Sequence, residues 1–435
     1  MIRGRPGVAR AVLAALLVVP AALRAQDTSH VEGVRVGITY AAGIRPGLLV
    51  LWTPGLDSVG AIIQRDLDYS DQFEMIPGAF NPHQGAVNEG LYRGMGASYA
   101  VEVSGVSGAV DIRLHDLVAL QVRQDRVAVL PGVGAPDFRM AVHRVADEIV
   151  RWISGQPGIA ATQMLYDEGS QIFRIDADGA GRVAVTRPGE RALSPAWSPD
   201  GARMVFTSLG DGVAPVILET FATGARVTVP GTATGLNITP VFTPDGQGVA
   251  YAKSDEAGTD LYVANIVQMC CVQRLTVGRY SDNLSPTFSP DGQRVAFVSN
   301  RPGVPQVYVM AADGTGQDLF APFDFGATGD SYAPDWSPDG ASVVFHREVS
   351  GTPQVFVLDV ARRKVRQLTS AGRNEDASWA PDGRHVVFVS DRSGRRQLWV
   401  VDIMSGRMRQ IVTAAAARLP AWSRRLAATA PVFTR

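Results

Sequence analysis

The chain has 435 residues, of which 46% are hydrophobic and 19% charged, and its formal net charge is −1. This composition predicts a packed core and excludes a chain that is disordered overall. It has no basic surplus that would indicate nucleic-acid binding. The 45 glycines and 27 prolines favour a turn-rich, mostly β body over long helices.

Residues 1–25 have the pattern of an export signal. A segment with three arginines and no acid precedes the apolar stretch "AVLAALLVVPAAL", and "LRA" places a small residue at Ala25. We therefore expect cleavage after Ala25 and an exported mature chain. The apolar stretch is too short to span a bilayer. A lipid anchor is not indicated either, because no cysteine stands at the expected cleavage point.

Residues 26–154 contain no repeat and predict a small α/β domain. We expect a buried strand over residues 48–52, a helix over 57–69 capped by Asp57, a β-meander over 98–106, 109–117 and 117–123, and an amphipathic helix over 137–153. The Gly- and Pro-containing stretch 155–160 predicts a linker to a second domain over 161–435.

The second domain is built from a repeat. A strand that ends in Trp or Phe is followed by x-Pro-Asp-Gly, which predicts a type I turn. Five copies end at Gly201, Gly246, Gly292, Gly340 and Gly383, and a shortened copy, "LPAWS", contains Trp422. Spacings in the mid-forties with strand patterning predict the blades of a β-propeller.

The ends of this domain predict how the ring closes. Residues 163–187 read as the second, third and fourth strands of a blade, without the motif in front of them, and "LPAWS" can supply the missing first strand. We therefore expect six blades, one of them shared between the two ends of the domain, because an open ring would expose strand edges.

The sequence gives little support to an enzyme. It contains no G-x-S-x-G motif of a hydrolase domain. Only His346 and His385 fall in the propeller, both on second strands away from the axis, so no catalytic, cofactor-binding or metal-binding residue is expected. A channel calcium held by Asp330, Asp335 or Asp376 stays open as an alternative to solvated acids.

The two cysteines, Cys270 and Cys271, are neighbours. Adjacent residues of a strand point to opposite faces, so a bond between them would need a strained turn. We expect both in an outer strand, and whether they are redox active is open.

The sequence resembles the TolB family, periplasmic components of the Tol–Pal system. The resemblance is carried by "VRVGITYAAGIRPGLLVL", by "GASYAVEVSGV" followed by "DIRLHDL", by "HRVADEIVRWISGQPGIAATQMLYD" and by the final "LPAWS". "LWTPG" departs from the family, which often has a Pro-Phe-containing segment there, and Ser154-Gly155 replaces its Thr-Gly.

The resemblance implies a periplasmic, monomeric, non-enzymatic protein without cofactors, which neither binds nucleic acid nor inserts into the membrane. It implies that the propeller binds the peptidoglycan-associated lipoprotein Pal at the mouth of its channel. It further implies that the N-terminal segment engages the C-terminal domain of TolA, and that the system maintains the outer membrane and constricts it at division. An exported propeller that binds another envelope protein or a glycan remains the alternative.

The loops that lead into the first strands lie at one rim of the channel. They combine polar residues with Leu236, Leu284 and Tyr332 as apolar anchors for a folded partner, although Asn, Asp and Ser also favour plain exposed turns. The predicted Pal-binding rim is Leu236, Asn237, Thr239, Asn283, Leu284, Ser285, Asp330, Ser331, Tyr332, Glu375 and Asp376. The predicted TolA-binding segment is Gln26, Asp27, Thr28, Ser29, His30, Val31, Glu32, Gly33, Val34 and Arg35.

Overall fold

The structure is a computed structural model that describes residues 45–76, 86–106, 108–278, 280–322, 329–426 and Phe433. The predicted signal peptide, its cleavage site at Ala25 and the predicted TolA-binding segment lie outside these residues. Residues 43–435 form one compact unit. Within the described residues, no helix is both long and apolar enough to cross a membrane.

The N-terminal part is a five-stranded sheet in the order β2-β1-β3-β4-β5. Strand β1 runs parallel to β2 and β3, and β3, β4 and β5 form an antiparallel meander. The meander is confirmed, except that residues 117–120 form a turn and its third strand begins at Gln121. The strands are β1 (Gly47–Trp52), β2 (Glu74–Met75), β3 (Ala97–Val106), β4 (Ala109–Asp116) and β5 (Gln121–Ala128).

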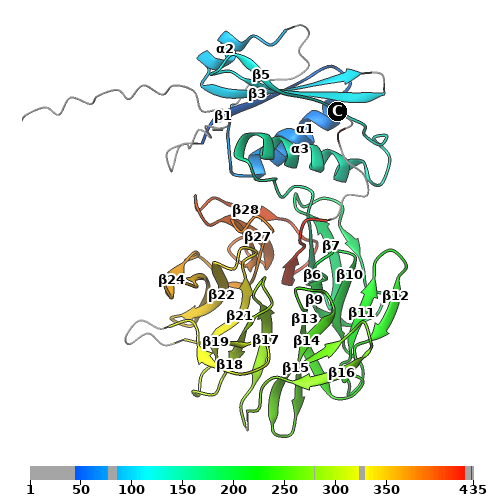
Figure 1. Cartoon of the computed structure of the whole chain (residues 1–435), viewed down its shortest axis with the longest axis vertical. Coiled ribbons are helices and arrows are strands. Elements are labelled where there is room, and N and C mark those ends of the chain that lie inside the picture. The colour runs from blue at the N-terminus through cyan, green and yellow to red at the C-terminus, as the bar shows by residue number, and fades with distance from the viewer. Residues whose placement is uncertain are drawn as a thin grey trace, which may run out of the picture. The chain divides into compact units, whose positions relative to one another are not determined.

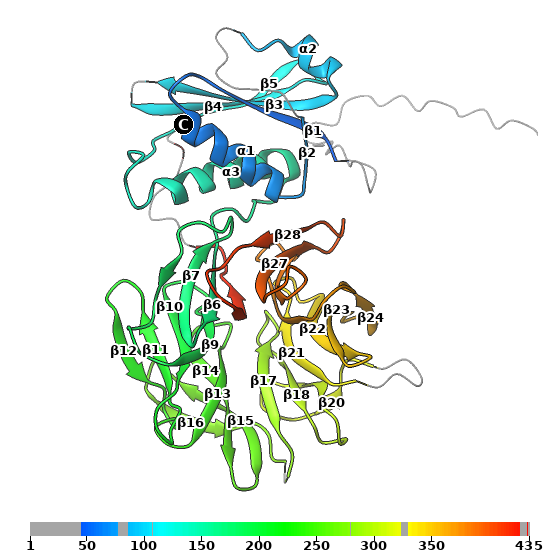
Figure 2. The same cartoon turned by 180° about the vertical axis from the view of Figure 1, so that it is seen from behind.

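Two helices cover one face of this sheet (Figures 1 and 2). Helices α1 (Asp57–Tyr69) and α3 (Phe138–Ser154) place Ile63, Leu67, Val142 and further apolar residues in one core with β1, β3 and β4. The short α2 (Glu89–Gly94) was not predicted. The expected cap at Asp57 is wrong, because Leu56 stands at the N-cap and Asp57 instead accepts a hydrogen bond from Trp52 Nε1 at 3.1 Å.

The remainder forms six four-stranded antiparallel sheets, which confirms the predicted α/β domain followed by a six-bladed β-propeller (Figure 1). From inner to outer strand the sheets are β9 (Ala192–Trp197), β10 (Arg203–Ser208), β11 (Val216–Thr220), β12 (Ala225–Thr228); β13 (Leu236–Phe242), β14 (Gly248–Asp255), β15 (Gly258–Asn265), β16 (Cys270–Arg274); β17 (Asn283–Phe288), β18 (Arg294–Ser299), β19 (Gln306–Ala311), β20 (Asp318–Leu319); β21 (Ser331–Trp336), β22 (Ser342–Val349), β23 (Thr352–Asp359), β24 (Lys364–Gln367); β25 (Asn374–Trp379), β26 (His385–Ser390), β27 (Gln397–Asp402), β28 (Met408–Ile411); and β29 (Ala417–Trp422), β6 (Gln163–Glu168), β7 (Gln171–Asp176), β8 (Val183–Ala184).

Each repeat motif makes the expected reversal between a first and a second strand. In the first copy the N–H of Gly201 donates to the carbonyl of Ser198 at 2.9 Å, and Gly201 has a φ of 71° that favours glycine. The Ser198 hydroxyl contacts Asp200 and accepts the N–H of Arg203 at 2.9 Å. The motif therefore fixes both the turn and the start of the second strand.

The ring closes as predicted from the two ends of the domain. Strand β29 pairs antiparallel with β6, with Trp422 opposite Met164 and Ala417 opposite Glu168. Ser423 Oγ also accepts the N–H of Gln163 at 3.0 Å. One blade thus joins residues that lie more than 250 positions apart in the chain.

Neighbouring blades approach closely at Gly314, which gives a first prediction. A Cβ at this residue would lie 2.3 Å from the carbonyl oxygen of Leu275, at the end of the preceding blade. We expect Gly314→Ala to lower the free energy of unfolding by about 1–3 kcal/mol, measured by urea titration. The control is Gly316→Ala, since Gly316 also has a positive φ but nothing within 4 Å of its Cβ position. Equal losses for the two variants would contradict the close approach.

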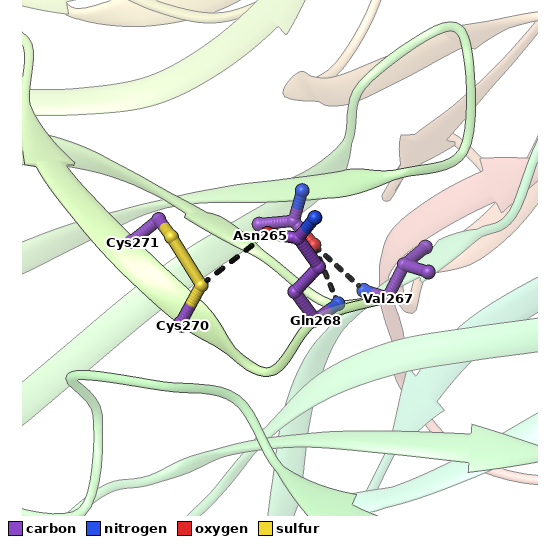
Figure 3. The surroundings of a disulfide bond; sticks show 5 residues. All are labelled: Asn265, Val267, Gln268, Cys270 and Cys271. Atoms are coloured by element: carbon purple, nitrogen blue, oxygen red, sulfur yellow. Dashed lines mark hydrogen bonds between the residues drawn. A yellow bond between two sulfur atoms is a disulfide. The ribbon is translucent and has the colours of Figure 1, made fainter.

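Cys270 and Cys271 are joined in a disulfide, against the expectation that they stay unlinked (Figure 3). They do lie in the outer strand β16, as predicted. The strand does not alternate regularly here, because Met269 and Cys271 have positive φ values of 53° and 59° and its pairing with β15 shifts register. This irregular turn, which no sequence pattern predicted, brings both sulfur atoms together.

Candidate functional site: the propeller channel

The first strands of the six blades, β9, β13, β17, β21, β25 and β29, contact one another around the channel. Side chains on four of them, β13, β17, β21 and β25, accept a backbone N–H from the next blade, so the wall of the channel is also the seam between blades. Three of these bonds run from the N–H of Trp336 to Thr287 Oγ1 (3.3 Å), of Trp379 to Asp335 Oδ2 (2.8 Å) and of Trp422 to Ser378 Oγ (3.2 Å).

Every first strand carries a β-bulge with one non-glycine residue at positive φ. The pairing between first and second strand skips a register at this point in each blade. Such left-handed residues are uncommon, and a bulge bends its strand and re-aims the side chain. We call the six residues the bulge ring: Ser194 (φ 54°), Thr239 (50°), Ser285 (51°), Ala333 (48°), Asp376 (53°) and Leu419 (49°). They line a depression of about 160 Å³ at one end of the channel.

The structure brings three of the predicted rim residues, Thr239, Ser285 and Asp376, into the bulge ring. Thr239 Oγ1 accepts the N–H of Ser285 at 3.1 Å, which again crosses from one blade to the next. Leu236 is 45% exposed at the start of β13, one position before buried Asn237, and Leu284 and Tyr332 are half-buried one position after the equivalent Asn283 and Ser331. These residues can contact a partner, while partner binding itself stays a prediction.

Three other predicted rim residues are fully buried, which corrects the expectation that their side chains face a partner. Asn237 Nδ2 donates to the carbonyl of Ala214 at 3.0 Å, and Asn283 Nδ2 to that of Thr259 at 3.1 Å. The Ser331 hydroxyl accepts from Arg347 Nε at 2.9 Å. These side chains satisfy buried backbone and side-chain groups where the loop enters the strand, and so hold the rim in place.

Asp376 links two neighbouring blades within the bulge ring. Its N–H donates to His346 Nδ1 at 3.2 Å, and its Oδ2 accepts the N–H of Leu419 at 3.3 Å. Burial lowers the pKa of His346 to about 4, so the ring is neutral and its Nδ1 is an acceptor. His346 stands on the second strand β22, as predicted, and its ring still reaches the backbone of the bulge ring at Asp376. Burial raises the pKa of Asp376.

The remaining predicted rim residues form local pairs. The Tyr332 hydroxyl donates to Asp330 Oδ2 at 3.0 Å, and burial together with this carboxylate raises the pKa of Tyr332 to about 12. Glu375 pairs with Arg373 and Arg396 at 3.2 and 3.3 Å. In the part of the chain that is described, Asp330, Asp335 and Asp376 do not form a group whose ligand atoms could share one ion.

The other end of the channel carries the tryptophans of the repeat and was not considered as a site from the sequence. A hollow of about 520 Å³ opens there, bordered by the prolines of the turns and by Arg424 and Arg425. Trp379 Nε1 donates to the carbonyl of Asp335, and Trp197 Nε1 to that of Ala421, both in the neighbouring blade. The tryptophans therefore link neighbouring blades at this end of the channel. Because the aromatic residue recurs at the same position of each repeat, the sequence could also have predicted this hollow.

The fold and the channel thus define a six-bladed β-propeller of the Ser-Pro-Asp-Gly repeat type with an α/β domain in front of it. The chain belongs to the TolB β-propeller domain family, whose model matches residues 152–321 and 325–429.

The similar proteins carry a common name. "Tol-Pal system protein TolB" of Bordetella avium is 29% identical over 229 residues, 49% of this chain and 51% of that protein. Its namesake in Alcanivorax borkumensis is 30% identical over 219 residues, 46% and 49% of the two chains. The chain is thus matched over about half the length of these curated relatives. The crystal structure of TolB from Acinetobacter baumannii shares the fold with a TM-score of 0.76 and 23% identity, covering 88% of this chain and 98% of that one.

Proposed function

We propose that this chain is the TolB component of a Tol–Pal envelope system and acts by binding proteins, without catalysis or a cofactor. The observation that carries the proposal is the family match over the whole propeller, together with the names of the similar proteins. The disulfide fits an oxidising compartment, and with the predicted export signal it supports a periplasmic location.

The proposed partner of the propeller is a Pal-like peptidoglycan-associated lipoprotein, bound at the bulge-ring end of the channel. This end combines a shallow depression with apolar side chains at the starts of the first strands. Buried Asn237, Asn283 and Ser331 hold the loops, so the surface is formed before a partner arrives, which lowers the entropic cost of binding.

A binding measurement with matched variants tests the rim. We expect Leu236→Ala together with Tyr332→Ala to weaken binding of the Pal-like lipoprotein by tenfold or more in calorimetry or surface plasmon resonance, because both changes truncate apolar anchors. Val227→Ala on the outer strand β12 is the control, because Val227 is 46% exposed and Leu236 is 45% exposed. Unchanged affinity of the rim variant would overturn this assignment.

The proposed partner of the segment Gln26–Arg35 is the C-terminal domain of TolA, which would take it as an added strand. Deleting this segment is the second arm of the same measurement. The proposal expects loss of TolA binding with Pal binding intact, and retained TolA affinity would contradict it.

A further inference from the structure

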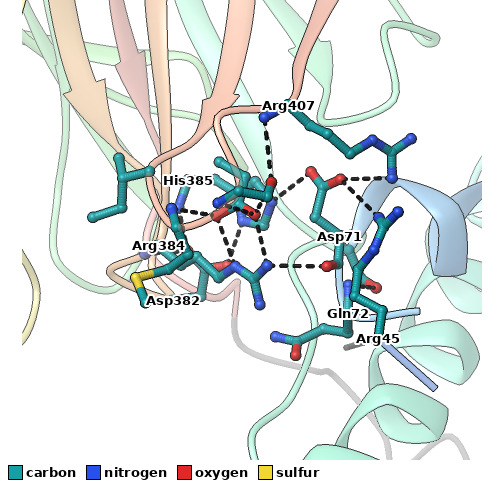
Figure 4. Close-up of polar contacts among 12 residues, drawn as sticks. Arg45, Asp71, Gln72, Asp382, Arg384, His385 and Arg407 are labelled. Carbon is teal, nitrogen blue, oxygen red and sulfur yellow. Dashed lines mark hydrogen bonds and ion pairs between the residues drawn. The ribbon is translucent and has the colours of Figure 1, made fainter. Parts of the chain in front are cut away.

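Two buried histidines lie where the α/β domain meets the propeller, and the site described above uses neither. His143 belongs to α3 of the α/β domain, and His385 begins β26 of the propeller. Both are 0% exposed. Each lies between a carboxylate of its own domain and a carboxylate of the other (Figure 4 shows His385).

The surroundings of His385 require a charged ring. Its Nδ1 lies 2.6 Å from Asp382 Oδ2, and its Nε2 lies 3.2 Å from Asp71 Oδ2, which comes from the turn after α1. A neutral imidazole has one N–H and would turn a lone pair toward one of the carboxylates, whereas an imidazolium donates to both. Burial alone would lower the pKa of His385, but the hydrogen bonds to Asp382 and Asp71 outweigh it and raise the pKa.

The second histidine also stands between two carboxylates, with one hydrogen bond and one longer ion pair. His143 Nδ1 lies 2.6 Å from Asp66 Oδ2 in its own domain, and its Nε2 points toward Asp178 Oδ2 of the propeller at 3.8 Å. Burial opposes a charged ring here too, yet the hydrogen bond to Asp66 and the nearby Asp178 raise the pKa of His143. Burial also raises the pKa of Asp66, although the hydrogen bond to His143 and the charges of His143 and Arg65 act against it.

Asp66, His143 and Asp178 offer ligand atoms within 4.8 Å of one another. Arg65 and Arg139, however, both form ion pairs with the Asp178 carboxylate. A cation placed there would meet two guanidinium charges, so the geometry favours a proton on His143 over a metal ion.

Arginines complete the charge balance around both histidines. Arg407 Nη1 lies 2.8 Å from Asp71 Oδ1, and Arg384 Nη2 donates to the carbonyl of Asp71 at 3.0 Å. Buried Arg409 lies over the ring of Tyr69, and burial lowers its pKa. The charged groups facing the histidines are Arg45, Asp71, Asp382, Arg384, Asp402, Arg407 and Arg409 around His385, and Arg65, Asp66, Arg139, Asp147, Asp176, Asp178 and Arg409 around His143.

We propose that His143 and His385, with Asp66, Asp71, Asp178 and Asp382, form a proton-dependent latch that holds the α/β domain on the propeller. Both rings are imidazolium in the docked state. Loss of their protons turns two attractive contacts across the boundary into contacts between a lone pair and a carboxylate, and the α/β domain loosens.

The sign of the pH dependence follows from the histidines. A group whose pKa is raised by docking stabilises the docked state fully below its ordinary pKa and loses this effect as the pH rises through the raised value. The pKa values of Asp178 and Asp382 are lowered, chiefly by hydrogen bonds and by the charges of His143 and His385 acting against burial. Their contributions are lost only when the pH falls below the usual carboxylate range. Docking is therefore strongest in mildly acidic solution and weakens above neutrality.

Hydrogen exchange of the full-length mature protein between about pH 6 and about pH 9, corrected for intrinsic rates, tests the latch. From the lower to the higher pH, the protection factors of residues 66–75 and 402–409 are expected to fall about tenfold for each unit by which docking raises a histidine pKa. The protection factors of β3 and β4 are expected to stay the same. In the variant His143→Gln with His385→Gln, protection of these segments is expected to be low and independent of pH. His115→Gln is the control, because His115 pairs with Glu102 inside the α/β sheet at 3.1 Å.

Nitrogen-15 spectra of the histidine rings provide a measurement that needs no variant. The latch requires both nitrogens of His143 and His385 to carry protons at neutral pH, while His346, whose pKa is lowered to about 4, stays neutral. A neutral ring at His385 and His143 at pH 7, or equal protection of the boundary across the pH range, would overturn the proposal. So would a pH dependence that the glutamine variant retains.

Discussion

Replacing Trp422 by alanine is expected to lower the free energy of unfolding by about 3–5 kcal/mol. Trp422 is 6% exposed in the closing strand β29 and packs in a core shared with Met164, Tyr166 and Val387. Its Nε1 donates to Thr162 Oγ1 at 2.8 Å, so the truncation also leaves that hydroxyl without its donor. The measurement is urea unfolding followed by circular dichroism, with the midpoint and the slope both recorded.

Two further variants separate the contribution of apolar packing at Trp422 from that of its hydrogen bond and from the effect of truncating an exposed side chain. Trp422→Phe keeps most of the apolar volume and removes only the hydrogen bond, so we expect a loss of about 1–2 kcal/mol. Met404→Ala changes a side chain that is 76% exposed and is expected to change little. If Trp422→Ala unfolded at the wild-type midpoint, the seam between β29 and β6 would not limit the stability of the ring.

The repeat made the propeller predictable because its information is local. Pro, Asp and Gly at fixed positions set the turn, and the aromatic residue in front of them ends a buried strand. The spacing then gave the number of blades, and the unmatched pieces at residues 163–187 and around Trp422 gave the closure. Helix bounds in the α/β domain were also close, since apolar periodicity alone defines α1 and α3.

The bulge ring could not be predicted in the same way. Ser194, Thr239 and Ala333 adopt positive φ values where a bulge interrupts the ladder, and no glycine marks these positions in the sequence. Their conformation follows from six strands converging on the channel, which no single repeat reveals. For the same reason Asn237 and Asn283 were expected to face a partner: their polarity suggested exposure, while the fold uses it to satisfy buried carbonyls.

The boundary between the domains depends on pairs that are remote in the chain. Asp71 and His385 are 314 residues apart, and Asp66 and His143 are 77 apart. In the sequence each of these reads as an ordinary polar position of a helix, a turn or a strand end. Only the tertiary arrangement encloses them together and changes their protonation.

Replacing Asp147 by alanine is expected to lower the free energy of unfolding by about 2–5 kcal/mol, because two buried backbone donors lose their acceptor. Asp147 lies on α3, where Oδ1 accepts the N–H of Ala160 at 2.7 Å and Oδ2 that of Ala161 at 3.0 Å. Gly158 packs so closely on this carboxylate that a Cβ would lie 2.4 Å from Oδ1. One side chain thus fixes the segment that leads into the propeller.

The pH dependence of stability, compared between the wild type and Asp147→Asn, separates the effect of the carboxylate charge from that of the side-chain volume. Burial raises the pKa of Asp147 to about 7 despite the two N–H donors, so between its ordinary value and 7 the folded protein holds a proton that the unfolded chain releases. This group therefore lowers stability as the pH rises through that range. Asp147→Asn is expected to remove this part of the slope, and Glu148→Ala, next to it and paired with Arg151, to leave it unchanged. If hydrogen exchange at Ala160 and Ala161 were as slow in Asp147→Ala as in the wild type, these donors would have another acceptor, and the attachment of the linker to α3 would have to come from apolar packing alone.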